Sequence, residues 1–250
     1  MASLPLPAAA ARDRQAATGL ALAAAVAGGW LALHVYAVFF YDLTGWGWAA
    51  ALPMVAVLCW LDVGLFIVAH DCMHGSLAPG RPGVNRWVGR VALALYAGFW
   101  FDGFVAKHHA HHKHAGTAGD PDFAENHPTR FWPWYFNFFR EYFGLKEFGI
   151  LFAIFWTYLL VLGAPPVNMI LFWGVPSILS SLQLFAFGTF LPHRHEGPGG
   201  AHGFADRHMA RSNDFPRWLS LMTCFHFGYH HEHHRAPHLP WWKLPTERHG

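Results

Sequence analysis

Histidine dominates the chemistry that this sequence can support. More than half of its 20 histidines stand in three short clusters, HDCMH at 70–74, HHAHHKH at 108–114 and HHEHH at 230–234. Neutral imidazole is the commonest metal ligand among side chains, and residues three or four apart share one face of a helix. Each cluster follows or flanks a long apolar stretch. Three such faces, if they converge, could hold a metal centre.

The spacing within the clusters selects candidate ligands. His70 and His74 are four residues apart, the pattern HxxHH occurs in both other clusters, and His193 follows the last long apolar stretch. The set exceeds the roughly four ligands that a zinc ion takes, so we expect two metal ions. The candidate ligands are His70, His74, His108, His111, His112, His193, His230, His233 and His234.

The chemistry of the donors narrows the choice of metal. Imidazole-rich sites suit zinc, copper, iron or nickel, and redox-active iron is favoured where a buried site faces a hydrocarbon without a hydrolysable bond. A histidine-rich loop that binds metal loosely is the plain alternative. Loose binding is expected of a flexible tract. Three clusters with repeated spacing beside apolar helices therefore argue against that alternative.

Composition places these clusters in a membrane protein. Hydrophobic residues make up 54% of the chain and charged residues only 13%, whereas a soluble domain has about a quarter charged residues. The net charge of +2, without a basic block interleaved with aromatics, gives no indication of nucleic-acid binding. The three cysteines are isolated, without a CxxC pair, and are expected to be small buried residues.

Four apolar segments, residues 16–41, 49–69, 148–163 and 167–191, are long enough or nearly so to cross a bilayer, which takes about 20 helical residues. Pro176 predicts a kink in the fourth. The stretch 84–101 contains two arginines and is expected to be re-entrant or to lie along the membrane. We expect one membrane-embedded domain over residues 1–250, in which residues 1–15 form a flexible tail.

Basic residues predict the orientation. None of the 17 lysines and arginines falls in the connectors 42–48 or 164–166, and all lie near the N-terminus, in 70–147 or in 192–250. The positive-inside rule places those regions in the cytoplasm, with both termini. The expected fold is an all-α integral membrane protein whose four transmembrane helices form two hairpins. A cytoplasmic helical cap then carries the histidine-rich di-metal site.

The clusters and their flanks resemble bacterial β-carotene ketolases, within the integral-membrane di-iron oxygenases that include hydroxylases and desaturases. The resemblance covers about residues 30–245 and is carried by GLFIVAHDCMHGSLAPGRP at 64–82, AHHKHAGTAGDPDF at 110–123, LQLFAFGTFLPHRH at 182–195, FADRHMARS at 204–212, and SLMTCFHFGYHHEHH at 220–234 with PWWKLP at 240–245. One departure is Asp62, where a small uncharged residue is expected in the second helix. An acid there is costly unless it is hydrogen-bonded or faces a cavity.

The resemblance implies an activity and its requirements. Carbon 4 of a β-ionone ring would be oxidised to a ketone by two O2-dependent hydroxylations and a dehydration, taking β-carotene to echinenone and canthaxanthin and zeaxanthin toward astaxanthin. It implies two non-haem iron ions, the carotenoid and the lipid bilayer as partners, and a location in the bacterial inner membrane. No GxGxxG fingerprint is present, so the electrons come from an external donor, which we take to be ferredoxin.

The resemblance also implies residue roles. Asp122, in the DPDF motif, and Asp71 would take part in catalysis or hydrogen-bond a ligand imidazole. An aromatic ring pocket is the expected substrate site, with ordinary core packing as its alternative. Its candidate residues are Phe99, Trp100, Phe101 and Phe104. The residues expected beside the ligands are His208, His226, His231 and Glu232.

Three other functions are compatible with parts of the pattern. A carotenoid hydroxylase and a lipid desaturase would share the same metal site, because ligand spacing does not encode how long the ring stays in place. A metal transporter would instead place ionisable groups along a path through the membrane. Only Asp62 and His34 lie within the expected spans, which argues against transport.

Overall fold

The computed structural model describes residues 9–195, 204 and 206–249, and the regular structure in these ranges is helical throughout. Residues 1–8 of the expected tail lie outside these ranges, whereas residues 9–15 are already helical. The elements are α1 (Ala9–Val35), η1 (Tyr36–Phe40), α2 (Gly47–His74), α3 (Pro82–Ala97), α4 (Phe101–His114), α5 (Phe131–Tyr142), α6 (Leu145–Trp156), η2 (Thr157–Val161), α7 (Pro166–Met169), η3 (Ile170–Gly174), α8 (Val175–Phe185), η4 (Ala186–Phe190), α9 (Leu191–His193), α10 (Arg217–Cys224), α11 (His230–Arg235), η5 (Trp241–Lys243) and α12 (Leu244–His249).

Within the described ranges, three continuous helices are long and apolar enough to cross a membrane: Ala9–Phe40, Gly47–His74 and Pro166–His193. Two further pairs, α3 with α4 and α5 with α6 and η2, meet the same criterion only if each pair is one span, with bends of 98° and 80°. The chain is therefore an all-helical membrane protein with three to five candidate spans. The expected third span, residues 148–163, lies in the second bent pair and is not a continuous span by itself.

Pro176 lies inside the last span without ending it. Proline lacks the N–H that an α-helix needs, and its ring crowds the carbonyl four residues earlier. The π-helical turn Ile170–Gly174 directly precedes α8, in which Pro176 is the second residue. The predicted distortion thus takes the form of a wider helical turn within a helix that runs on to His193.

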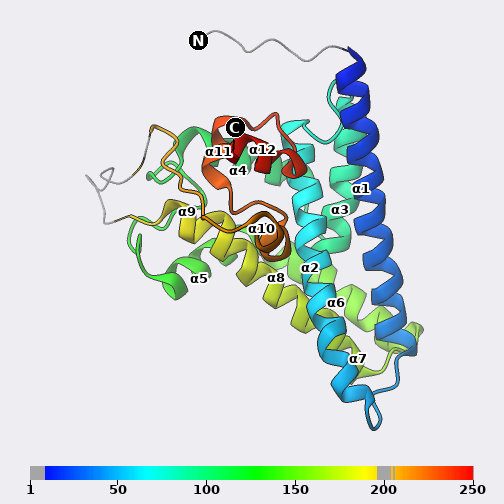
Figure 1. Cartoon of the computed structure of the whole chain (residues 1–250). Helices are drawn as coiled ribbons and strands as arrows, with labels where there is room; N and C mark the ends of the chain where they lie inside the picture. Colours follow the sequence, from blue (N-terminus) through cyan, green and yellow to red (C-terminus); the bar gives the residue numbers. More distant parts are fainter. Residues whose placement is uncertain (1–8, 196–203, 205, 250) are drawn as a thin grey trace.

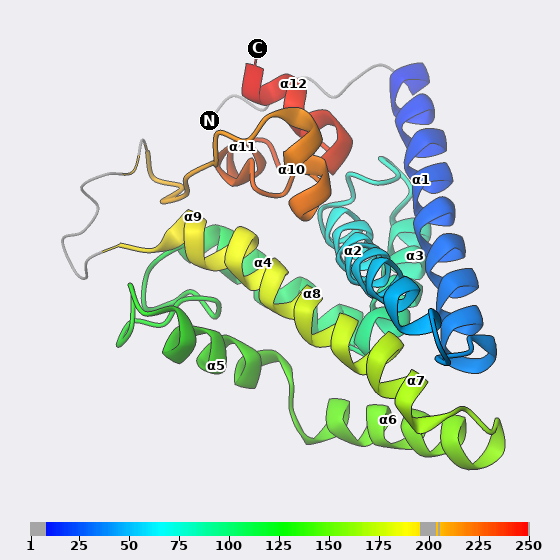
Figure 2. The same cartoon turned by 60° about the horizontal axis from the view of Figure 1, so that its bottom comes forward.

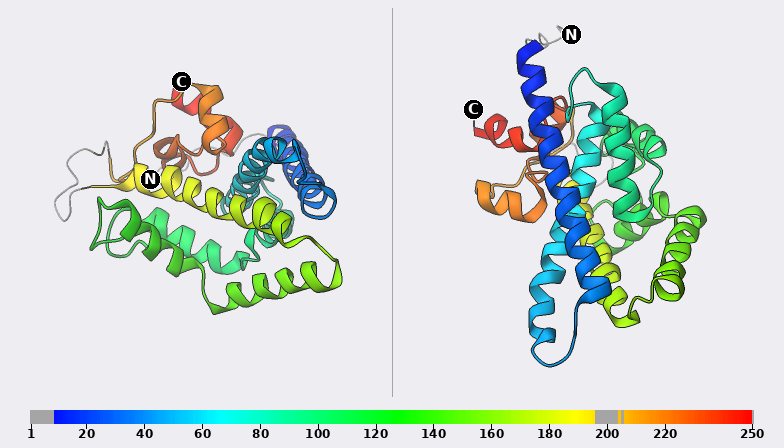
Figure 3. Two further views of the ribbon diagram at one scale, coloured as in Figure 1. Left: turned by 90° about the horizontal axis from the view of Figure 1, so that it is seen from below. Right: turned by 90° about the vertical axis from the view of Figure 1, so that its right-hand side faces the viewer.

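Helix α2 lies at the centre of the bundle, in contact with α1, α3 and α8 (Figure 1). Gly64 allows a close approach, since a Cβ atom there would lie 2.7 Å from the Phe225 ring and 2.9 Å from Val26. Helix α8 passes between the C-terminal helices and the α5–α6 pair (Figures 2 and 3). Elements far apart in sequence therefore meet around α2 and α8.

The histidine-bearing helices share one end of the molecule. Figure 1 shows α4, α11 and the N-terminal end of α1 at the top, and the connection from η1 to α2 at the bottom, beside α7. Helix α2 ends directly after its second histidine because Gly75 adopts the left-handed conformation, with a φ of 69°, and its N–H bonds back to Cys72 at 3.1 Å. The first cluster is therefore presented by the last turns of α2.

Asp62 has a partner within the bundle. Its carboxylate is 3% exposed and accepts a hydrogen bond of 2.6 Å from Trp30 Nε1 of α1. The Trp30 ring stacks on His34 at 4.5 Å, and His34 Nε2 lies 3.2 Å from the Tyr158 hydroxyl. Asp62, the residue that departs from the expected pattern, thus accepts a hydrogen bond that joins α1 to α2.

The hydrogen bond from Trp30 predicts how substitutions at Asp62 will behave. Asp62→Leu leaves the buried Trp30 N–H without an acceptor, which costs about 1–3 kcal/mol. We expect the melting temperature of the purified protein in detergent to fall by roughly 2–10 °C. Asp62→Asn keeps an acceptor oxygen and serves as the matched control. Equal melting temperatures for the two variants would contradict this assignment.

Candidate metal centre

All the candidate ligands predicted from the spacing converge at one end of the bundle. His70 and His74 come from the end of α2, and His193 from the end of α9. Helix α4 contributes His108, His111 and His112, and helix α11 contributes His230, His233 and His234. The i, i+3 and i+4 spacings place each set on one helical face, so the short helices need only dock against α2 and α9 to bring the rings together.

The imidazoles form two groups. The first consists of His70, His74, His108, His112 and His233, with one ring nitrogen of each lying within 4.8 Å of the others. In this group the Nε2 atoms of His74 and His108 are 2.7 Å apart, and those of His112 and His233 are 3.0 Å apart. Three helices that are distant in sequence thus supply this group.

The second group consists of His111, His193, His230 and His234. Its Nε2 atoms are 2.9 Å apart between His193 and His230, 3.0 Å between His230 and His234, and 3.2 Å between His111 and His234. The groups are adjacent, since the His112 and His234 rings stack at 4.2 Å. Every predicted ligand belongs to one of the two groups.

The donor set fits metal ions. Ligand nitrogens about 2.1 Å from an ion and at right angles to one another are about 3 Å apart, which is the spacing found here. His70 is 2% exposed, and neither of its ring nitrogens has a hydrogen-bond partner. Burial lowers the pKa of His230, His233 and His234 well below the ordinary value. These rings are therefore neutral at pH 7, the form of imidazole that binds metal.

Asp120 orients one of the rings. His111 Nδ1 donates to the two carboxylate oxygens of Asp120 at 2.9 and 3.0 Å, and Asp120 also accepts the N–H groups of Gly116 and Asp122. Burial acts to raise the pKa of Asp120, but the His111 imidazole outweighs it and holds that pKa below its usual value. The carboxylate thus keeps the proton on Nδ1 and leaves Nε2 directed at the second group. Asp120 is not among the residues predicted from the sequence, although the DPDF motif contains both Asp120 and Asp122.

The two predicted catalytic acids occupy different surroundings. Asp122 Oδ2 lies 3.7 Å from His111 Nδ1, Asp122 Oδ1 accepts a hydrogen bond from the Tyr142 hydroxyl, and burial raises the pKa of Asp122 to about 6. Asp71 Oδ1 lies 3.7 Å from His70 Nδ1, while its Oδ2 accepts the Trp241 backbone N–H at 3.0 Å. Asp122 therefore faces the cavity described below, whereas Asp71 joins the C-terminal segment to α2.

The other residues expected beside the ligands belong to neither group. The His208 ring lies 6.4 Å from His234, and His231 Nε2 lies 3.0 Å from Asp206. Glu232 bonds to Ser212 and Arg248. His226 stacks on Tyr229 at 5.8 Å, and burial lowers its pKa to about 4. These contacts hold the C-terminal segments together around the histidine groups.

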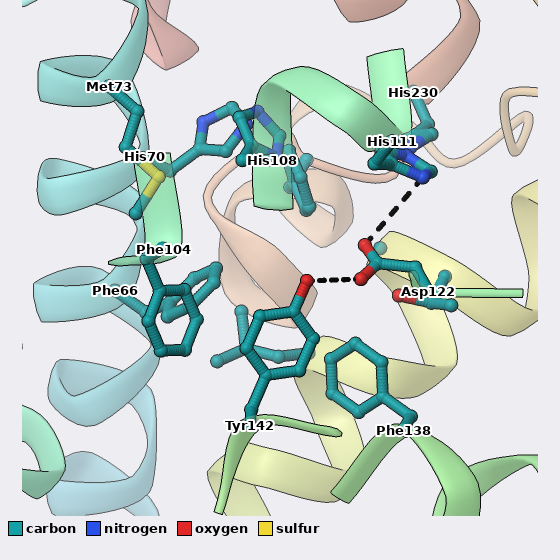
Figure 4. Close-up of a pocket in the computed structure, with 14 residues that line it drawn as sticks. Phe66, His70, Met73, Phe104, His108, His111, Asp122, Phe138, Tyr142 and His230 are labelled. Carbon is teal, nitrogen blue, oxygen red and sulfur yellow. Dashed lines mark hydrogen bonds and ion pairs between the residues drawn. The ribbon is translucent and has the colours of Figure 1, made fainter. Parts of the chain in front are cut away.

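Two cavities lie near the histidines, and Figure 4 shows the residues that line the inner one. The inner one, of about 470 Å³, is lined by both histidine groups and by Asp122, and the outer one, of about 740 Å³, is mostly aromatic. Phe104 lines both, and Phe99 lines the outer one. Trp100 and Phe101 line neither of these two cavities, and their expected place in a ring pocket stays a prediction. Trp100 is 57% exposed beneath Lys146, and Phe101 packs against Gly89.

The fold and this site define an all-helical membrane protein with a histidine-rich, metal-competent centre. The sequence model of the Fatty acid desaturase family matches residues 46–156 and 147–249, and the chain belongs to this family. It is 51% identical over 235 residues to a beta-carotene ketolase of Paracoccus sp. (strain PC1), covering 92% of this chain and 91% of that protein. A beta-carotene ketolase of Paracoccus sp. (strain N81106 / MBIC 01143) is 50% identical, with 93% of each covered. A zeaxanthin 4-ketolase of Chlamydomonas reinhardtii is 38% identical over 92% of this chain and 53% of that protein.

Two histidines of neighbouring turns in α4 provide a test of the metal site. His111→Ala removes a member of the second group, and we expect the metal bound per purified chain to fall. His114, three residues later, is exposed and outside both groups. His114→Ala should therefore bind as much metal as the parent. The measurement is elemental analysis after dialysis, and equal metal contents in the two variants would refute the assignment.

Asp120 has a separate expected effect. Losing the carboxylate that orients a ligand imidazole typically costs about 10–100-fold in metal affinity. We expect Asp120→Ala to weaken metal binding by that factor in a competition titration with a chelator. Asp206→Ala, which removes the acid paired with His231, is the matched control and should leave the affinity at the parental value. The reverse order of effects would exclude Asp120 as the orienting group.

Proposed function

We propose that this chain is a carotenoid 4-ketolase that oxidises carbon 4 of β-ionone rings to a ketone. The observation that carries the proposal is an aromatic cavity leading to two histidine groups, in a chain about half identical to two curated beta-carotene ketolases over more than nine-tenths of each sequence. β-Carotene would give echinenone and then canthaxanthin, and zeaxanthin would lead toward astaxanthin.

The overall chemistry balances as two oxidations of one carbon. Each hydroxylation consumes one O2, two electrons and two protons, inserts one oxygen atom into a C–H bond and releases one water. The first converts the 4-methylene to an alcohol and the second gives a geminal diol, which loses water to become the ketone. Two non-haem iron ions, bound by the two histidine groups, would supply the activation of O2 that this chemistry requires.

The protein's own contribution is placement of the ring and exclusion of water. Phe66, Phe104 and Phe138 line both cavities and surround the passage to the histidines. Ile178, which is 53% exposed, lines the outer cavity and marks its approach to the apolar surface. A long hydrocarbon can thus enter from the lipid side and bring one end ring to the centre. An apolar passage also keeps bulk water from the reacting carbon.

We infer a cytoplasmic orientation for the histidine end and an external one-electron donor such as ferredoxin. The connectors free of lysine and arginine lie at the end of the bundle away from the histidines (Figure 1). In a bacterium the membrane concerned would be the inner membrane. The proposed arrangement remains four spans in two hairpins with a cytoplasmic cap, in which each bent helix pair lies partly in the membrane.

Pigment analysis tests the proposed activity. In cells that produce β-carotene, we expect expression of the chain to yield echinenone and canthaxanthin. His233→Ala, which removes a member of the first group, should abolish ketone formation while the protein remains in the membrane fraction. Hydroxylated pigments without any ketone would identify a hydroxylase instead, and unchanged β-carotene with the protein and reductant present would contradict both activities.

A further inference from the structure

The two cavities meet at a narrow set of side chains with one hydroxyl among them. Five residues line both cavities: Phe66, Phe104, Phe138, Tyr142 and Leu184. Four are hydrocarbon side chains, so the Tyr142 hydroxyl is the polar group of this junction. In Figure 4 the Tyr142 ring rises between Phe104 and Phe138 with its oxygen directed to Asp122, below His108 and His111.

Packing holds Tyr142 in this position. As the last residue of α5, it contacts Phe104 with ring centroids 4.6 Å apart and Phe138 at 5.0 Å, and Lys107 Nζ lies 4.8 Å from its ring centre. Its hydroxyl donates to Asp122 Oδ1. A β-ionone ring without oxygen has no group that could bond to either side chain. The Tyr142–Asp122 pair therefore forms no hydrogen bond with the unoxidised hydrocarbon.

The pair retains the capacity to accept one more hydrogen bond. A phenolic oxygen has two acceptor positions besides the hydrogen that it donates. Asp122 Oδ2 is 3.7 Å from His111 Nδ1, which is longer than a hydrogen bond. Both acceptors line the inner cavity, where the histidine groups also lie. A hydroxyl formed on the ring beside the histidines can donate to them.

We propose that Tyr142, held by Asp122, binds the 4-hydroxy ring produced by the first oxidation and keeps carbon 4 at the centre for the second. Tyr142 is then a specificity-determining residue that directs the product to the ketone instead of releasing the alcohol. This inference rests on the proposed ketolase function. The histidine ligands are compatible with a single hydroxylation and so do not explain why a ketone forms. The role of Tyr142 supplies this explanation.

The first test measures the ratio of 4-hydroxy to 4-keto pigments in β-carotene-producing cells. Tyr142→Phe removes the hydroxyl and keeps the ring, and we expect the alcohol-to-ketone ratio to rise at least about tenfold, the effect of losing a hydrogen bond to a charged pair. Tyr135→Phe is the matched control. Tyr135 belongs to the same helix, its hydroxyl lies 3.1 Å from Ser181, and it lines neither cavity. Its ratio should equal the parental one.

If Tyr142→Phe makes no oxidised pigment, a binding measurement tests whether Tyr142 binds the 4-hydroxy ring. Without reductant, quenching of tryptophan fluorescence in detergent gives dissociation constants for 4-hydroxy-β-carotene and β-carotene. The parent and Tyr135→Phe should prefer the alcohol, and Tyr142→Phe should lose this preference by at least about tenfold. An unchanged preference would overturn the proposal, as would an unchanged pigment ratio in an active variant. Failure of the parent to form ketone would instead contradict the ketolase function, so the two failures are distinguishable.

Discussion

The structure depends on the convergence of imidazoles that are buried together. The Nε2 atoms of neighbouring rings face one another at 2.7–3.2 Å, both ring nitrogens of His70 lack a hydrogen-bond partner, and so do the Nδ1 atoms of His230 and His234. Burying such groups unpaired costs free energy. Metal ions held by both groups would supply the missing interactions and would join α2, α4, α9 and α11 at once. We therefore regard the centre as part of the fold as well as of the chemistry.

The bundle is built so that this convergence can occur in a membrane. Helix α2 presents the first cluster in its last turns and is held to α1 through the bond from Trp30 to Asp62, while Asp71 accepts the Trp241 N–H and draws the C-terminal segment onto α2. The passage from the outer cavity to the histidines is lined by residues of α2, α4, α5 and α8. The mostly aromatic outer cavity and the cavity beside the histidine groups thus share one wall, to which Tyr142 belongs.

Local spacing in the sequence was sufficient for part of this account. The i, i+3 and i+4 patterns identified every member of the two groups except His193, because a helix fixes which residues share a face, and His193 was identified by its place after the last apolar stretch. Features that depend on loops and bends were not predictable in this way. The turn after α4 makes Asp120 the partner of His111, and the break between α3 and α4 directs Phe99 and Phe104 to the cavity but Trp100 away from it. The 80° bend between α5 and α6 likewise could not be predicted, and because of it the apolar residues 148–163 do not form a continuous span by themselves.

X-ray absorption at the iron edge of the purified, iron-loaded protein tests the central claim most directly. The account predicts two iron ions per chain, each surrounded by nitrogen and oxygen atoms at about 2.0–2.2 Å with the multiple-scattering pattern of several imidazoles. A single ion, sulfur ligands, or a spectrum of iron bound only by water and carboxylate would contradict it.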